Sequence, residues 1–191
     1  MKARYQLTEL ITLSSSPYKM DRVSFFGPMC SGKTYLARQL QEYFGHTKVG
    51  FADKLKSVAI DLYQIDPKDK NGATRKLLQE FADDIKKWDA QIFIKHFLLS
   101  AEKYKQVVCD DMRFYEESVF LRQNEFTLIK VNCDEARRQE RIQQLYPSTL
   151  EGAQSHRSET DYLKIVPDFE VNSNSPSDVK ELVDLVRNYG Y

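Results

Sequence analysis

Short, mostly apolar runs alternate along the chain with stretches of helical periodicity. The apolar runs predict buried strands at 23–26, 48–51, 106–109, 126–132 and 169–171. Apolar residues three and four positions apart predict amphipathic helices at 35–44, 54–63, 74–86, 89–103, 134–144 and 177–188. Strands that alternate with helices form parallel sheets with right-handed crossovers. The pattern therefore predicts a three-layer α/β fold around a central five-stranded parallel sheet.

Residues 1–21 lie outside this alternation. Leu7, Leu10 and Ile11 have the spacing of a short amphipathic helix, and the Ser-Ser-Ser-Pro run at 14–17 interrupts it. We therefore expect an N-terminal extension over 1–21, whose role the sequence does not indicate, and a single domain over 22–191.

Composition and charge narrow the classes of function. The 191 residues include 28 Lys and Arg and 28 Asp and Glu, so the formal net charge is zero. A nucleic-acid-binding domain is usually basic, so we expect no nucleic-acid partner, although a local basic funnel for a small anion remains compatible. No apolar run approaches the roughly 20 residues of a membrane span, so we expect no membrane partner. The N-terminal stretch is too charged for a secretory signal.

The number and spacing of the cysteines indicate the cellular location that we expect. Cys30, Cys109 and Cys133 have no metal-type spacing, which favours a reduced, cytoplasmic location. We expect all three to act as small buried hydrophobic residues, and Trp88 to serve packing.

The segment GPMCSGKT at 27–34 fits the pattern G-x-x-x-x-G-K-[ST] at each fixed position. Two glycines let consecutive main-chain N–H groups point at a phosphate, and the N-terminus of the next helix adds a positive dipole end. In this chemistry Lys33 reaches the β- and γ-phosphate oxygens, and the Thr34 hydroxyl binds Mg²⁺. A plain glycine-rich turn is the alternative, but a strand precedes the segment and a helix follows it. We therefore predict a P-loop; its ATP-binding residues are Gly27, Ser31, Gly32, Lys33, Thr34 and Tyr35.

Two carboxylates follow the predicted third strand. Ligands of open α/β sheets bind beyond the carboxyl ends of the strands, where Asp110 and Asp111 lie. One can hold Mg²⁺ and the other can accept hydrogen bonds from an acceptor, unless both simply begin a helix. We assign Asp110 to the metal with Thr34 and Asp111 to the acceptor, although the residues alone leave the two interchangeable. Arg113 is expected at the acceptor site.

Arginines cluster on the helix before a polar segment. Arg137 and Arg141 share a face by their i, i+4 spacing, and Arg138 lies beside them. Guanidinium groups suit the charge that gathers on a transferred phosphoryl group, and a lid over about 137–162 would bring them to ATP. A solvated face with Glu135 and Glu140 is the alternative. The predicted catalytic residues are Lys33, Arg137, Arg141 and Asp110.

Further segments in order carry a family resemblance. They read FADKLK at 51–56, TRKLLQ at 74–79, DDMRFYE at 110–116, HRSE at 156–159 and DFEVN at 168–172. Together with the P-loop they resemble the bacteriophage deoxynucleoside monophosphate kinases, within the nucleoside-monophosphate-kinase-like P-loop fold. The resemblance runs from about Val23 to the end of the chain.

The resemblance implies transfer of a phosphoryl group from ATP to a deoxynucleoside monophosphate (dNMP), giving ADP and the diphosphate with Mg²⁺ as cofactor. It implies mobile acceptor-binding helices over about 52–100, a lid, host cytoplasm as the location if the source is viral, and a possible homodimer. Arg75 and Lys56 would hold the acceptor's phosphate, and Asp111 and Arg113 its sugar or base. The other implied acceptor-binding residues are Asp53, Gln79, His156, Ser158 and Glu159, and a polar turn with Asn172 and Ser173 would pack the adenine of ATP.

Two departures leave alternatives open. Pro28, Met29 and Cys30 stand where the family more often has small or basic residues, and 80–84 lacks its usual GT-(D/E) stretch, so base preference is undefined. The alternatives are a phosphomevalonate or dephospho-coenzyme A kinase, a polynucleotide-end kinase, and a non-catalytic nucleotide-binding module.

Overall fold

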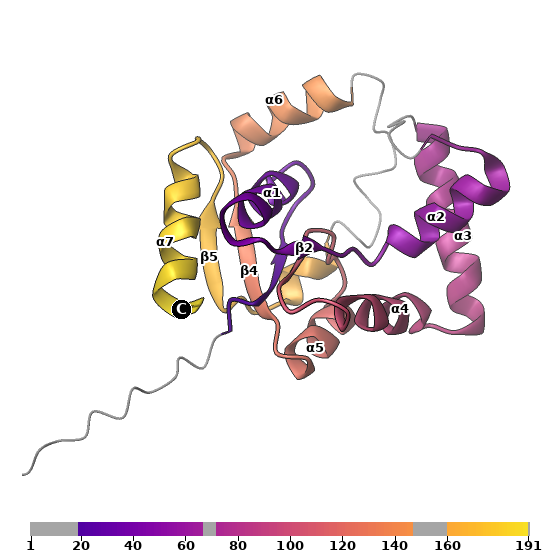
Figure 1. Ribbon diagram of the computed structural model, residues 1–191. Coiled ribbons are helices and arrows are strands. Elements are labelled where there is room, and N and C mark those ends of the chain that lie inside the picture. The colour runs from indigo at the N-terminus through magenta and orange to yellow at the C-terminus, as the bar shows by residue number, and fades with distance from the viewer. Residues whose placement is uncertain (1–18, 67–71, 147–159, 191) are drawn as a thin grey trace, which may run out of the picture.

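Five parallel strands form the central sheet of the computed structural model, which describes residues 19–66, 72–146 and 160–190 (Figure 1). The strands are β1 (Arg22–Phe26), β2 (Thr47–Lys48), β3 (Val107–Cys109), β4 (Thr127–Asn132) and β5 (Phe169–Asn172), in the order β2-β3-β1-β4-β5. The predicted five-stranded parallel sheet is therefore confirmed. Because β1 is central, the loop that follows it lies between the carboxyl ends of β3 and β4.

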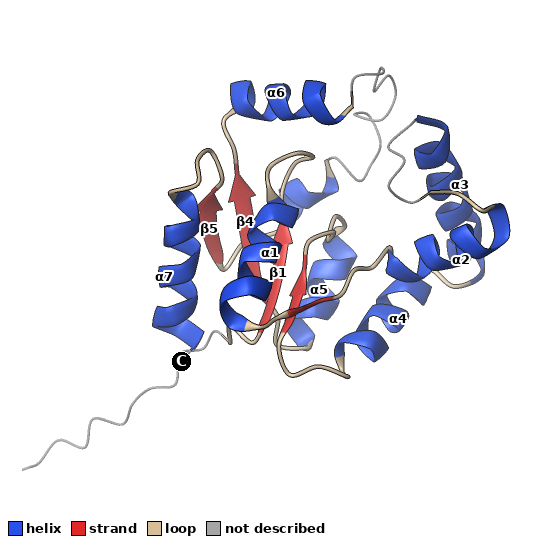
Figure 2. Ribbon diagram, turned by 45° about the horizontal axis from the view of Figure 1, so that its top comes forward, coloured by secondary structure: helices blue, strands red, loops and turns tan. Residues whose placement is uncertain are grey.

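Alternation along β1 directs side chains to two separate cores. Val23 and Phe25 belong to the cluster on one face, and Phe26 to the cluster on the other. Helices α1 (Lys33–Phe44) and α7 (Asp178–Gly190) cover the first face with buried residues such as Leu36 and Leu182 (Figure 2). This arrangement gives the first outer layer.

The second outer layer consists of α4 (Ile92–Ala101), α5 (Tyr115–Gln123) and the short 3₁₀ helix η2 (Asp161–Lys164). Phe97 of α4 stacks on Phe51 with ring centroids 4.3 Å apart, and Leu121 of α5 is fully buried. The three-layer prediction is therefore confirmed. Through the Phe51 ring, the segment after β2 packs against this second layer.

Three more helices surround the carboxyl ends of the strands. Helices α2 (Asp53–Tyr63) and α3 (Gly72–Trp88) pack together beyond the β2 edge, and α6 (Glu135–Leu145) crosses above the strand ends (Figure 1). They enclose the edge of the sheet where ligands of open α/β folds bind.

Residues 19–21, at the end of the predicted extension, pack against the sheet. Met20 is buried, its carbonyl contacts the His46 ring nitrogen at 2.8 Å, and the Asp21 carbonyl accepts the Val107 N–H at 2.7 Å. Residues 1–18 lie outside the described part of the chain. Among the described residues, no helix has the length and apolarity that crossing a membrane requires.

Several element predictions were wrong in detail. The predicted strand at 48–51 ends at Lys48, because the N–H groups of Phe51 and Ala52 bind the Asp111 carboxylate and not a neighbouring strand. Helix α5 was missed, because its first turn was interpreted only as part of a strand-end motif. Trp88 is 93% exposed, so it does not serve packing within this chain.

The three cysteines also differ from one another. Cys109 is fully buried, as expected, and burial raises the pKa of its thiol well above the usual value. Cys30 and Cys133 are only half-buried, which corrects the expectation that all three are interior residues.

Candidate active site

The P-loop connects β1 to α1 with two glycines in the left-handed region. Gly27 has φ 137° and Gly32 has φ 98°. A Cβ atom at position 27 would lie 2.7 Å from the Val131 carbonyl oxygen, and one at position 32 would overlap the Ser173 hydroxyl. Side chains are therefore excluded at both positions, by backbone conformation and by close approach.

The Lys33 ammonium lies over this loop. Its Nζ donates to the carbonyl oxygens of Gly27 at 2.8 Å and Pro28 at 2.6 Å. Lys33 is also the first residue of α1, whose N-terminal N–H groups and dipole favour an anion at the same place. The loop therefore has a conformation and a positive charge that suit a bound phosphate.

The two strand-end carboxylates have different surroundings. Asp110 is buried and pairs with the Lys48 ammonium at 2.8 Å. Burial alone would lower the pKa of Lys48, but the hydrogen bond and charge of Asp110 raise it above the ordinary value. Asp111 accepts the N–H groups of Phe51 at 2.9 Å and Ala52 at 3.1 Å, so it fixes the turn into α2.

The donor set near the P-loop fits magnesium. Thr34 is exposed in the first turn of α1, and Asp110 follows β3, which pairs with β1 ahead of the loop. Hydroxyl and carboxylate oxygens are the ligands that Mg²⁺ prefers, and it usually completes its shell with water and substrate phosphates. Within the described residues, no group of three or more His, Cys, Asp or Glu side chains could hold a metal by itself.

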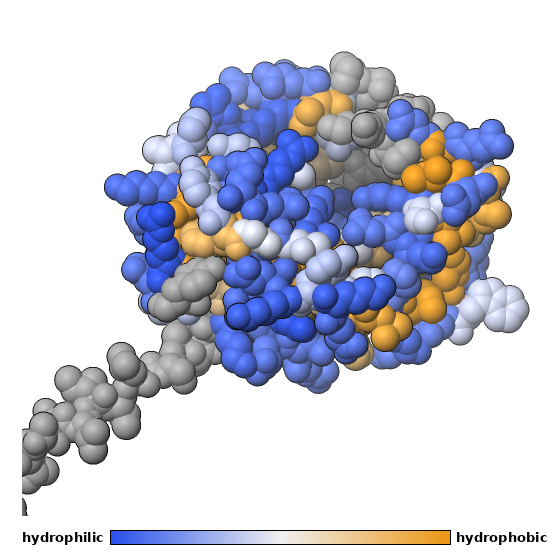
Figure 3. Space-filling view, viewed as in Figure 1, coloured by the Kyte–Doolittle hydropathy of each residue, from blue (hydrophilic) through white to orange (hydrophobic). Residues whose placement is uncertain are grey.

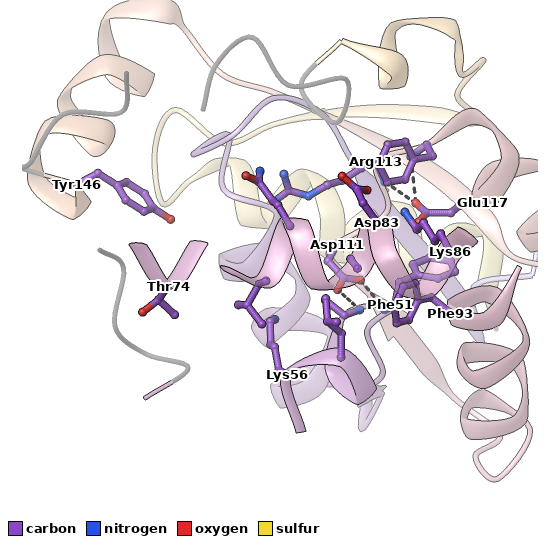
Figure 4. A pocket seen from close by; sticks show the side chains of 16 residues that line it. Phe51, Lys56, Thr74, Asp83, Lys86, Phe93, Asp111, Arg113, Glu117 and Tyr146 are labelled. Atoms are coloured by element: carbon purple, nitrogen blue, oxygen red, sulfur yellow. Dashed lines mark hydrogen bonds between the residues drawn. The ribbon is translucent and has the colours of Figure 1, made fainter. Parts of the chain in front are cut away.

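A cavity of about 320 Å³ opens beside Asp111, at the same edge of the sheet. In the space-filling view the surface is hollowed here, between α6 above and the apolar flank of α2 and α3 (Figure 3). Most of its wall is apolar, and charged groups stand at intervals along it (Figure 4). The lining residues are Phe51, Ala52, Leu55, Lys56, Thr74, Leu78, Gln79, Ala82, Asp83, Lys86, Phe93, Asp111, Arg113, Phe114, Glu117 and Tyr146.

Four of the predicted acceptor-binding residues meet in this cavity: Lys56, Gln79, Asp111 and Arg113. Asp53 does not line it; its carboxylate accepts the Gly50 N–H at 2.7 Å, and burial raises its pKa. Other predicted residues cannot be placed in the same way, because only the backbone of Arg75, on α3, is described, and His156, Ser158 and Glu159 lie outside the described residues.

Arg141 connects α6 to the P-loop. Its guanidinium donates to the Ser173 hydroxyl at 3.1 Å, to the Ser173 carbonyl, and to the Cys30 carbonyl at 3.4 Å. The Ser173 hydroxyl in turn donates to the Ser31 carbonyl. The turn after β5, the P-loop and α6 are thus joined around one buried serine.

Of the other α6 arginines, Arg138 and not Arg137 faces the P-loop. Arg138 pairs with Glu135 at 2.7 Å, and its NH1 lies 3.5 Å from the Met29 carbonyl oxygen. Arg137, which was grouped with Arg141, pairs with Glu140 at 3.2 Å and is 53% exposed. The i, i+3 spacing of Arg138 and Arg141 was as good a signal as the i, i+4 spacing that we used.

The polar turn after β5 lies beside the loop. Asn172 ends β5 with an exposed side chain, and Ser173 is buried behind the P-loop. The Asp178 carboxylate accepts the N–H groups of Asn174 at 2.6 Å and Ser175 at 3.0 Å, which holds the turn to α7. Tyr35, in the first turn of α1, is 46% exposed.

Glu117 is a cavity residue that the sequence analysis missed. It is buried on α5, where it accepts the N–H groups of Arg113 at 2.8 Å and Phe114 at 3.0 Å. Burial raises its pKa to about 7, against the opposing effect of those two hydrogen bonds. A glutamate at the third residue of a helix is a known N-terminal signal, which would have revealed both the residue and α5.

Solved structures of low sequence identity share this fold. TT1252 from Thermus thermophilus matches with a TM-score of 0.60 at 13% identity, over 90% of this chain and 97% of that chain. The APS kinase of Mycobacterium tuberculosis, in complex with AMPPNP and APS, gives 0.53 at 16% identity, over 90% and 99%. Shikimate kinase from Bacteroides thetaiotaomicron gives 0.50 at 13% identity, over 87% and 98%.

These similarities identify the fold class. No family model matches the sequence, and the comparison with curated proteins gives no match. The chain has the three-layer P-loop kinase fold, as the sequence predicted.

Proposed function

We propose that the chain is an ATP- and Mg²⁺-dependent phosphotransferase whose acceptor is a deoxynucleoside 5′-monophosphate. The observation that carries the proposal is the position of the cavity: it opens at the sheet edge that holds the P-loop, and it gathers Lys56, Gln79, Asp111 and Arg113. A nucleotide donor and a second, partly charged acceptor would therefore meet at one edge.

On the donor side, the P-loop amides and Lys33 bind the polyphosphate. A bound phosphate would replace the Gly27 and Pro28 carbonyls as the partner of the ammonium. Arg141 and Arg138 approach the loop from α6 and supply further positive charge near the transferred group. Thr34 and Asp110 would hold Mg²⁺, which supplies charge neutralisation at the phosphates when it is bound.

On the acceptor side, an apolar wall and a few charges suit a planar ring with an anionic end. Phe51, Phe93 and Phe114 offer aromatic surface, and Lys56 offers positive charge. Arg75, on the same wall-forming helix, is proposed as its partner at the acceptor's phosphate. An acceptor that is already anionic needs no strong base, so positioning and charge neutralisation account for the chemistry.

The test is an acceptor panel coupled to ADP release. It contains the four common dNMPs, with phosphomevalonate, dephospho-coenzyme A and APS as competing acceptors. We expect Mg²⁺-dependent ADP formation with at least one dNMP and background rates with the other three compounds. ADP formation only with a non-nucleotide acceptor or APS would overturn the acceptor assignment and leave the phosphotransferase assignment intact.

ATP binding is measured separately, by calorimetry with magnesium and no acceptor. Saturable binding is expected for the wild-type chain. Absence of binding would overturn the phosphotransferase assignment as a whole.

A further inference from the structure

The acceptor cavity contains a buried carboxyl group with one oxygen still available. In Glu117, Oε2 accepts both main-chain N–H groups at the start of α5. No group among the residues that the structure describes donates a hydrogen bond to Oε1, and this atom is open to the cavity and not among the buried unpaired atoms. The side chain lines the cavity (Figure 4). A ligand in the cavity can therefore donate a hydrogen bond to Oε1, and the burial of the rest of the carboxyl group strengthens such a bond.

A cation stands beside this oxygen. Lys86, on α3, lies with its ammonium 4.5 Å from the centroid of the Phe114 ring and 5.8 Å from that of Phe93. Figure 4 shows Lys86 and Glu117 at the same end of the cavity, and Lys56 and Thr74 at the other. The first end thus offers a hydrogen-bond acceptor and a donor close to aromatic surface.

We infer that Glu117 and Lys86 select the acceptor's base, Glu117 by accepting a hydrogen bond from a ring N–H and Lys86 by donating to the adjacent ring carbonyl. The inference rests on the proposed function. It assigns the preferred acceptors to bases with a ring N–H next to C=O, as in thymine and guanine. Cytosine and adenine have a bare ring nitrogen in place of this N–H, and an amino group in place of the C4 or C6 carbonyl. With those bases the ring nitrogen, an acceptor, would face Glu117, and the amino group, a donor, would face Lys86.

Protonation of Glu117 should make the preference between bases depend on pH. The groups around the carboxyl are Asp111 after β3, Arg113 before α5, and Asp83 and Lys86 on α3. Burial and the charge of Asp111 raise the pKa of Glu117, to about 7, against the two hydrogen bonds and the charge of Lys86. Above that pH Oε1 accepts a ring N–H; below it, Oε1 carries the proton and instead suits a bare ring nitrogen.

The experiment compares dTMP with 5-methyl-dCMP, which have the same shape and differ only at this edge. We expect wild-type kcat/KM at pH 8 to favour dTMP at least tenfold, because a mismatched edge leaves buried groups unpaired. The preference should fall as the pH is lowered from 8 to 6. Both acceptors carry the same phosphate, so its own titration cancels in the ratio.

Glu117→Gln is the diagnostic variant. Its amide oxygen can still accept the two main-chain N–H groups, while its NH₂ group replaces Oε1 with a donor. We expect the preference to shift at least tenfold towards 5-methyl-dCMP and to become independent of pH, with KM for ATP unchanged. Glu181→Gln, at an exposed position of α7 on the opposite side of the sheet, is the control and should behave as wild type.

Equal kcat/KM for the two acceptors in the wild-type chain, or the same ratio in Glu117→Gln, would overturn the inference while dNMP kinase activity stands. The wild-type pH series needs no variant, so it decides the matter even if Glu117→Gln fails to fold. Loss of activity with every dNMP, but retained ATP binding, would be a failure of the proposed function itself.

Discussion

The two halves of the candidate site are built by different means. The P-loop half is made mainly of backbone: two glycines in the left-handed region, main-chain amides and a lysine held by carbonyl oxygens. The acceptor half is made of side chains from α2, α3, α5 and the end of β3, around a cavity of about 320 Å³. Backbone contacts depend little on side-chain identity, so the first half suits a common donor and the second an individual acceptor.

The comparison predicts that the largest single effect comes from the P-loop lysine, whose ammonium lies over the backbone of the loop. Lys33→Ala removes the ammonium over the loop and should lower kcat by about 10²–10³-fold, in line with the loss of one transition-state donor. Steady-state kinetics with saturating ATP and acceptor measures the effect. A loss below tenfold would contradict the central role of the P-loop lysine.

In the acceptor half, the buried carboxyl of Glu117 should make the free energy of unfolding depend on pH. The pKa of Glu117 is higher in the folded chain than its ordinary value of 4.5, so its favourable contribution is present below pH 4.5 and is lost as the pH rises to about 7. Glu117→Gln avoids that loss, and its stability relative to wild type should rise by up to ~3 kcal/mol from pH 4.5 to 8, at about 1.4 kcal/mol per pH unit.

Denaturant unfolding of both proteins at several pH values measures this difference. Glu181→Gln, an exposed carboxyl on α7, serves as the control and should show no such change. A pH-independent difference between wild type and Glu117→Gln would mean that the buried carboxyl does not titrate near neutrality.

Substitution of Gly32, just before α1, tests whether ATP binding depends on the close approach of Ser173 to the P-loop or only on the left-handed backbone conformation. Gly32→Ala adds a left-handed alanine, at a cost of ~1–2 kcal/mol, and a Cβ atom in contact with Ser173. Gly45→Ala is the matched control: its φ is 75°, but the nearest atom to the added Cβ is Gln106 Oε1 at 3.8 Å.

Both variants should lose stability in thermal unfolding, and only Gly32→Ala should weaken ATP binding, by about tenfold or more in calorimetry. Equal ATP affinities for the two variants would show that the contact between Ser173 and the P-loop does not shape the donor site.

The smallest expected effect separates the two halves by kinetics. Arg75→Ala should raise the acceptor KM about tenfold, as the loss of one charged hydrogen bond implies, and leave KM for ATP nearly unchanged. Initial rates over a matrix of both substrates measure the two constants together. Equal losses for ATP and acceptor would show that Arg75 serves both halves and that the division drawn between them is wrong.

Much of this arrangement was predictable from the sequence. The five parallel strands could be predicted from apolar runs, because strands covered on both faces need apolar side chains. The P-loop could be predicted from its motif, because the backbone conformation of the loop requires glycine at positions 27 and 32. The meeting of Lys56, Gln79, Asp111 and Arg113 followed from motifs in matching order, since spacing alone does not bring distant segments together.

The rest depends on directions that periodicity does not encode. Arg137 and Arg138 are neighbours on one helix, and only packing against the P-loop decides which of them faces it. Asp111 was interpreted as an acceptor-binding residue, with the start of a helix as the alternative, but its carboxylate accepts two main-chain N–H groups just after the second strand. Glu117 was missed because a buried, partly paired carboxyl on α5 resembles an ordinary helix-start residue in sequence.

Helix α6 touches both halves. Arg141 contacts the P-loop and the turn after β5, and Tyr146, which follows the last turn of the helix, lines the acceptor cavity. Because Arg141 and Tyr146 belong to one rigid helix and its end, a shift of α6 on ATP binding would move both contacts together. We therefore predict that the two sites are coupled, each substrate changing the affinity for the other by the same factor, which calorimetry of ATP with and without the acceptor measures.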